Sequence, residues 1–308
     1  MRLFRTVSST VGLDVGSACI RAVALTSARG EWSLVAAGEA GIDRQHLDVR
    51  PLAQRLLDDL GLRRANVTVA VPAQAAIVRR FRIPVGDGRD LDRRVGLEAE
   101  EHLQAGPEEI TLSYQLLDPP SSDRDRGDLD EVEVLFGAAR RTDVADRAAL
   151  VTGRGRAASV ADVEGLALAN LYTLSYPDHA GAALLLHVGH RSTVLSLVEH
   201  GHVVTTRGID VGAGAFGSAS DLATAIRQGA GIRPEHRSAG GATRIMLSGG
   251  ASAIAGLSDH LAAEFGMSVE LVHPLRRIRT TATSRGAEHM GPAFALATGL
   301  ALRRKGDR

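Results

Sequence analysis

The chain has 308 residues, of which 44% are hydrophobic and only 3% aromatic, and its 36 basic residues equal its 36 acidic residues in number. This length suits two domains of ordinary size with aliphatic cores. The zero net charge argues against chain-wide attraction to nucleic acid or anionic lipid. The single cysteine, Cys19, excludes an internal disulfide and favours a cytoplasmic compartment. We therefore expect no nucleic-acid partner, and contact with a membrane only through other proteins.

The first part of the chain predicts three strands, a helix and a fourth strand. Apolar runs predict strands over 11–16 and 20–25, and alternation predicts a half-exposed strand over 31–40. A helix is predicted over 49–61, with Pro51 in its first turn and Gly61 at its end. The fourth strand is predicted over 66–72.

The same order of elements begins again at residue 182. The pattern predicts three strands, a helix, a strand and a helix, over 182–188, 193–199, 202–208, 220–228, 243–248 and 257–266. Asp14 and His187 end the first strand of each unit and lie 173 positions apart (187 − 14). A repeat of that length indicates a domain duplication rather than a solenoid.

The segments between the two units interrupt this repeat. They predict a helix over 89–106, strands over 110–117 and 133–139 around a mixed-charge loop (118–131), and helices near 143–152 and 162–175. The last helix is predicted over 292–305. It is apolar around most of its circumference, so we expect it to pack between other elements.

Three glycine turns carry the chemistry of this sequence. In GLDVGS (12–17), glycine lets the backbone approach a phosphate, the serine hydroxyl can donate a hydrogen bond, and the acid can hold the water shell of Mg²⁺. VGHRST (188–193) predicts a second phosphate clamp, and SGGASAIAG (248–256) suits close approach to a nucleoside. The sequence has no Walker motif.

Ordered segments along nearly the whole chain resemble the actin-like ATPase superfamily and, within it, the PilM family of type IV pilus assembly proteins. The segments are VTVAVPAQAAIVRRFRIP, LEAEEHLQAGPEEITLSYQLL, ADVEGLALANLY, LLLHVGHRSTVLSLVEHG, IMLSGGASAIAGLSDHLAAEFG and GPAFALATGLAL. The resemblance implies an α/β fold of two actin-like (ribonuclease H-like) lobes. Lobe I would cover 1–178, with an inserted subdomain at about 76–138 like that of the cell-division protein FtsA. A reduced lobe II would cover 179–290, and a C-terminal helix (291–308) would pack back between the lobes.

The resemblance also implies that ATP with Mg²⁺ binds between the lobes. The implied nucleotide-binding residues are Asp14, Gly16, Ser17 and Arg21 in the first lobe, and Gly189, Thr193, Gly249 and Gly250 in the second. Asp14 would hold Mg²⁺ through water, and no residue is assigned a catalytic role. Arg21 stands where the family usually has lysine.

Two departures from the family pattern argue against ATP hydrolysis. His187 replaces the acid expected at the second phosphate turn, and the segment from Asp210 to Arg244 is shorter than the helical subdomain of the family. We therefore expect nucleotide, where it binds, to act as a conformational ligand. Asp14 could instead cap its turn, and His187 could be a strand-end histidine with a satisfied hydrogen bond.

The function implied by the resemblance is that of a cytoplasmic scaffold in the inner-membrane platform of a type IV pilus. Such a scaffold binds the cytoplasmic tail of a PilN-like membrane protein in a groove between the first subdomain and the insert. Contacts with other platform or motor proteins and a homo-oligomer stay open. Three alternative functions stay open as well: an active ATPase or kinase, the cytoplasmic actin-like component of a type II secretion system, and an FtsA-like filament former.

Overall fold

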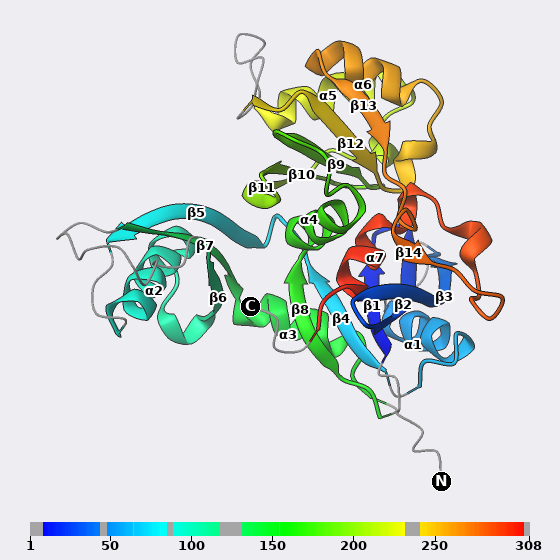
Figure 1. Cartoon of the computed structure of the whole chain (residues 1–308), viewed down its shortest axis with the longest axis horizontal. Helices are drawn as coiled ribbons and strands as arrows, with labels where there is room; N and C mark the ends of the chain where they lie inside the picture. The colour runs from blue at the N-terminus through cyan, green and yellow to red at the C-terminus, as the bar shows by residue number, and fades with distance from the viewer. Residues whose placement is uncertain are drawn as a thin grey trace.

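The computed structural model describes residues 9–43, 48–63, 65–84, 89–117, 131–153, 155–231 and 241–304. Its strands form two sheets, one of six strands and one of eight, and the two sheets face each other across helices α4 and α7 (Figure 1). The loop predicted over 118–131 lies outside the described residues except for its last position.

The first sheet contains the first predicted unit in the predicted order. Strands β1, β2 and β3 are antiparallel, helix α1 follows, and β4 returns parallel to β1; their bounds are Ser9–Val15, Cys19–Ala28, Glu31–Gly41, Arg50–Asp59 and Asn66–Val71. Two further strands extend the sheet, β8 (Ala158–Val163) beside β4 and the two-residue β14 (Ile278–Arg279) beside β3. Neither was predicted, because each is short and is defined by a partner strand far away in the sequence.

The second sheet repeats the same unit. Its core elements are β9 (Ala183–Val188), β10 (Thr193–Glu199), β11 (His202–Ile209), α5 (Ala219–Ala230), β12 (Arg244–Ser248), α6 (Leu257–Phe265) and β13 (Ser268–Leu271). Strands β9, β10 and β11 are antiparallel, and β12 is parallel to β9. The predicted duplication, and with it the α/β fold class, is confirmed.

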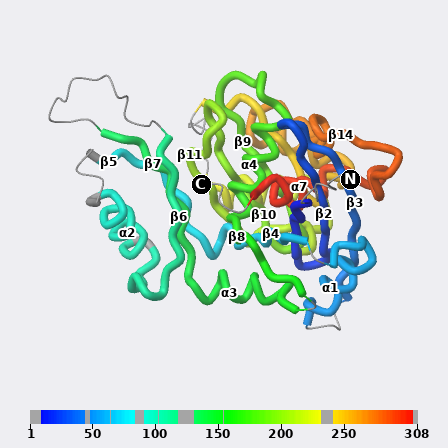
Figure 2. The backbone as a smooth tube through the Cα atoms, turned by 60° about the horizontal axis from the view of Figure 1, so that its bottom comes forward, coloured from blue at the N-terminus to red at the C-terminus, as the bar shows by residue number. Residues whose placement is uncertain are grey.

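The insert between β4 and α3 adds three strands to the second sheet, although it follows the first unit in the chain. Its elements are β5 (Ala76–Pro84), α2 (Arg89–Leu103), β6 (Ile110–Leu116) and β7 (Glu131–Arg140), followed by α3 (Arg141–Ala149). A single register pair, Thr205 with Arg79, joins β11 to β5. Within the insert, Arg80 forms an ion pair with Glu133 on β7. Figure 2 shows the insert projecting on the side of the molecule opposite to α1 and β3.

Helices α4 (Glu164–Ser175) and α7 (Ala295–Ala301) form a central layer. Helix α7 packs on β1, β2 and α4, and α4 packs on β10 and β11, while α1 covers the outer face of the first sheet and α5 and α6 that of the second (Figure 1). Every residue of α7 is buried, which explains its apolar circumference. Among the described residues, no helix has the length and apolar character needed to cross a membrane.

Candidate functional site: a cavity between two matched glycine turns

The two phosphate-type turns have the same hydrogen-bond geometry. The N–H of Gly16 donates to the carbonyl of Cys19 at 3.1 Å, and the N–H of Gly189 donates to the carbonyl of Ser192 at 2.9 Å. A Cβ atom at either glycine would lie about as close to the same carbonyl oxygen, at 3.0 and 2.9 Å. Each turn therefore requires glycine at that position, and its glycine N–H closes the turn instead of facing a ligand.

The N–H groups that follow these glycines remain available. Those of Ser17 and Ala18, and those of His190 and Arg191, have no backbone acceptor in the described part of the chain. Two adjacent N–H groups without acceptors in each turn form an arrangement that can receive an anion.

A cavity of about 300 Å³ lies between the two turns. Six of the eight predicted nucleotide-binding residues line it: Asp14, Gly16, Ser17, Arg21, Gly189 and Gly250. It also contains side chains to which the sequence assigned no role in binding, among them Glu164, His190 and Arg191. The structure therefore brings most of the predicted site residues together.

Thr193 and Gly249 lie beside the cavity without lining it. Thr193 corresponds by the repeat to Ile20; both are fully buried, and the Thr193 hydroxyl donates to the carbonyl of Val211 at 2.6 Å. Gly249 has a φ of 95°, and a Cβ there would lie 2.3 Å from the carbonyl oxygen of Val188. These two residues shape the surrounding turns.

Two carboxyl groups line the cavity, that of the buried Asp14 and that of the half-buried Glu164. Burial raises the pKa of Asp14 to about 6, against the opposing charges of Arg21 and Arg147. Burial raises the pKa of Glu164 to about 7, although the side chain accepts a 2.9 Å hydrogen bond from the N–H of Ala73. Sequence reasoning missed Glu164 because strand β8 was not predicted, so its position at a strand–helix junction was not visible.

His187, at the end of β9, is a neutral histidine whose ring has a hydrogen-bond partner. Its Nδ1 lies 3.0 Å from the hydroxyl of Ser248, its register partner on β12. Burial, with a further contribution from the charge of Arg21, lowers the pKa of His187 to about 4. The imidazole is therefore uncharged at neutral pH and supplies no negative charge to the second turn.

Arg21 and Cys19 lie on the first-sheet side of the cavity. The Nε of Arg21 donates to Glu39 at 3.0 Å, and its guanidinium lies 5.7 Å from the centre of the Phe294 ring. The Cys19 thiol lies 3.5 Å from the same carboxylate of Glu39. Burial is the main cause that raises the pKa of Cys19 to about 11, so this thiol is a poor nucleophile.

A second concavity, the groove, has a volume of about 360 Å³ and separates the insert from the first sheet. Strands β6 and β7 form one wall, and β8 and α4 form the other. Strands β6 and β8 are also the edge strands of their sheets. Asp162 is buried in this groove, 3.1 Å from Nε of Arg303, and burial raises its pKa to about 6.

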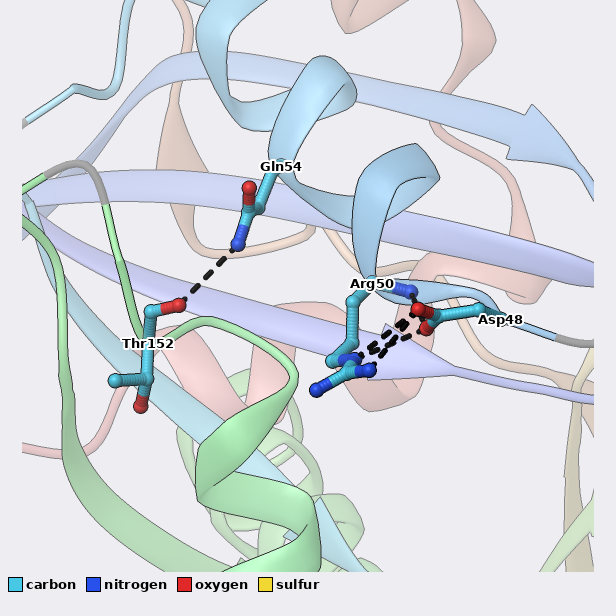
Figure 3. Close-up of polar contacts among 4 residues, drawn as sticks. All are labelled: Asp48, Arg50, Gln54 and Thr152. Carbon is cyan, nitrogen blue, oxygen red and sulfur yellow. Dashed lines mark hydrogen bonds and ion pairs between the residues drawn. The ribbon is translucent and has the colours of Figure 1, made fainter.

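A third hollow lies at the start of α1, and hydrogen bonds among the residues that line it hold the surrounding segments together. Asp48 accepts hydrogen bonds from the N–H and the Nε of Arg50, both at 3.0 Å, and Gln54 donates to the carbonyl of Thr152 at 3.2 Å (Figure 3). These contacts fix the start of α1 and join α1 to the segment after α3.

Two duplicated sheet units around a central helical layer, with a cavity between matched glycine turns, define an actin-like fold. The chain matches the family of type IV pilus assembly protein PilM over residues 12–219 and 236–305 and belongs to this family. The interruption of that match, 220–235, falls inside the segment 210–244 in which a shortened subdomain was expected.

Solved structures share this fold over nearly the whole chain. A PilM–PilN type IV pilus biogenesis complex is similar with a TM-score of 0.78 and 23% identity, covering 98% of this chain and 100% of that one. The cytoplasmic domain of EpsL, an inner-membrane component of the type II secretion system of Vibrio cholerae, is similar with a TM-score of 0.52 and 13% identity, covering 97% of each chain. A Bacteroides thetaiotaomicron protein with an actin-like ATPase fold has a TM-score of 0.51 and 10% identity, covering 98% of this chain and 100% of that one.

Proposed function

We propose that this chain is a scaffold of the type IV pilus assembly platform that binds the cytoplasmic tail of a PilN-like protein. Its membership of the PilM family supports this function, as does the likeness of its fold to the PilM–PilN complex. The scaffold would lie at the cytoplasmic face of the inner membrane and be held there by its partner. Likeness to the type II secretion protein EpsL is weaker, so that alternative is not favoured.

The observation that carries the proposal is the groove between the insert and the first sheet. It lies between the insert and the first sheet, where the resemblance to the family leads us to expect the partner tail, and its lining includes small side chains such as Gly137, Ala139 and Ala161. The edge strand β8 contributes Ser159 to Val163 to its lining. An extended peptide that pairs with such an edge gains backbone hydrogen bonds, while pockets for alternate side chains give specificity.

The proposal gives nucleotide a conformational role. ATP would bind in the cavity between the two glycine turns and join the first sheet to the second. It would bias the groove through a difference in affinity between conformations. The proposal requires no hydrolysis, and no residue is assigned a catalytic role in it.

A groove-blocking variant tests the proposal. Calorimetry would measure binding of a synthetic peptide that matches the cytoplasmic tail of the PilN-like protein from the same genome. Ala161→Arg places a long charged side chain in the groove and should weaken binding by roughly tenfold or more. Ala28→Arg, an exposed alanine at the end of β2, is the matched control. Tail binding that is absent in the wild type, or unchanged by Ala161→Arg, would contradict the proposal.

A further inference from the structure

The residues around the second turn do not fit the divalent metal that the family implies. Of the two matched strand ends, only that of β1 carries an acid, Asp14, because its repeat counterpart His187 is neutral and hydrogen-bonded to Ser248. The other acid in the cavity, Glu164, already accepts a hydrogen bond from the backbone. Within the described ranges, no group of three or more histidine, cysteine or acidic residues could hold a metal ion. Mg²⁺ at a nucleotide is usually held by one or two carboxylates besides phosphate oxygens and water, and the second of the two acids that line this cavity is already engaged with the backbone.

A guanidinium already lies in the space between the two turns. Arg21 is the register partner of Asp14 on β2, and its charge acts on both Asp14 and His187. Its Nη2 is 3.8 Å from the position that a Cβ of Gly250 would occupy, on the other side of the cavity. A divalent cation beside Asp14 would therefore lie close to a guanidinium that the fold holds in place and that Glu39 pairs through its Nε.

Two of the differences between the second turn and the first make the second turn more positive. His187 stands where the first turn has Asp14, and Arg191 stands where it has Ala18, 173 positions earlier (191 − 173). One exchange removes a negative charge and the other adds a positive charge. Together they shift the charge of the turn by two units, which is the charge of a magnesium ion.

Arg191 is free to contact a ligand. It is exposed at the mouth of the cavity and makes no hydrogen bond or ion pair with any residue in the part of the chain that the structure describes. A guanidinium presents several donors in a rigid fork that matches phosphate oxygens, and it stays charged at any physiological pH. The N–H groups of His190 and Arg191 itself lie in the same turn.

We propose that Arg191 and Arg21 neutralise the phosphates of a nucleotide in this cavity, so that the protein binds the free nucleoside triphosphate without a divalent cation. The inference rests on the nucleotide part of the proposed function. It assigns Arg191 as a ligand-binding residue and replaces the expected Mg²⁺ site at Asp14 by a site made of protein cations.

Calorimetric titration of the full chain with ATP, once in EDTA and once in excess Mg²⁺, tests this proposal. We expect the affinity in EDTA to equal or exceed that in Mg²⁺, because magnesium masks the charge that the arginines bind. Arg191→Ser should weaken ATP binding in EDTA by roughly ten- to a hundredfold, as expected for loss of a charge-assisted hydrogen bond. The control is Arg207→Ser, which replaces an exposed arginine on β11 outside the cavity and should leave the affinity for ATP in EDTA unchanged.

A double variant should restore the metal-dependent arrangement. His187→Asp with Arg191→Ala gives the second turn the acid and the alanine that the first turn has at these two positions, and its ATP binding should become stronger in Mg²⁺ than in EDTA. Wild-type binding that is tighter in Mg²⁺ than in EDTA would overturn the proposal, and so would an Arg191→Ser variant that binds ATP in EDTA as tightly as wild type. Absence of ATP binding in both buffers would overturn it too, while tail binding in the groove would be judged separately by its own titration. If the double variant does not fold, the exposed Arg191→Ser variant decides the result.

Discussion

Single residues in the cavity show how one repeated sequence pattern acquires two chemistries. Asp14 and His187 occupy equivalent strand ends, and both lie buried near Arg21. Burial disfavours the charged form of each group, so it raises the pKa of the acid and lowers that of the imidazole. The environment is thus similar on the two sides, and the difference in charge comes from the side chains themselves.

The raised pKa of Glu164 predicts a pH-dependent stability. An acid whose pKa is about 7 when folded and 4.5 when unfolded binds more protons in the folded state. Its contribution to stability is therefore present below about pH 4.5 and is lost as the pH rises through 7. Glu164→Gln removes this dependence. Between pH 4.5 and 7, the free energy of unfolding of wild type should therefore fall by about 1–3 kcal/mol relative to that of the variant.

Urea denaturation of both proteins at a series of pH values would measure this difference. Glu108→Gln, at an exposed acid outside the cavity, is the control and should run parallel to wild type. A constant difference between wild type and Glu164→Gln across the same pH range would contradict the prediction.

At the scale of the elements, α7 makes close backbone contacts with its neighbours. A Cβ at Gly12 of β1 would lie 2.0 Å from the carbonyl oxygen of Ala297, and a Cβ at Gly299 would lie 2.0 Å from that of Ala167 on α4. The hydroxyl of Thr10 also donates to the carbonyl of Ala301 at 2.5 Å. Helix α7 can occupy its place because neither Gly12 on β1 nor Gly299 on α7 itself carries a side chain there.

A pair of glycine variants tests this packing. Gly12→Ala should destabilise the protein by about 1–3 kcal/mol or more, since a backbone oxygen blocks the added methyl group. Gly96→Ala, on helix α2 with no atom within 4 Å of the added carbon, should be neutral or stabilise by up to about 1 kcal/mol. Chemical denaturation measures both. Equal stabilities of the two variants would show that α7 tolerates displacement.

Across the whole molecule, α4 and the segment before it connect the two candidate sites. Asp162 lies in the groove and Glu164, two residues later, lies in the cavity. A Cβ at Gly165 would lie 1.9 Å from the hydroxyl of Thr206 on the second sheet. The insert wall of the groove is joined to that same sheet through Thr205 and Arg79. A change in the distance between the sheets would therefore change the width of the groove.

This arrangement predicts coupling between nucleotide and tail. Saturating ATP should change the affinity of the tail peptide by roughly five- to a hundredfold, and the tail should change the affinity for ATP by the same factor. Gly165→Ala, which pushes α4 away from β11, should reduce that factor. Gly217→Ala, with open space around the added carbon, should preserve it. Equal tail affinities with and without ATP in the wild type would contradict the coupling.

Local signals in the sequence predicted most of the fold. The glycine turns, the strand runs around Asp14 and His187, and Pro51 at the start of α1 act over a few residues, so their patterns are readable without a structure. They were sufficient for the duplicated unit and the glycine turns, and the resemblance to the family added Arg21 to the residues that line the cavity. Thr193 was assigned to the site because a hydroxyl group can bind phosphate. Its position in the register of β10 instead buries the side chain in the core.

The sequence by itself determined the repeat, the two matched turns and the substitution of His187 for an acid, because these depend on residue types at fixed local spacing. Only the tertiary structure decided that Glu164 enters the cavity, that Arg21 lies between the two turns and that the insert extends the second sheet. Each of these facts depends on contacts between segments far apart in the chain. Such contacts are selected by packing and strand register, which no local pattern encodes.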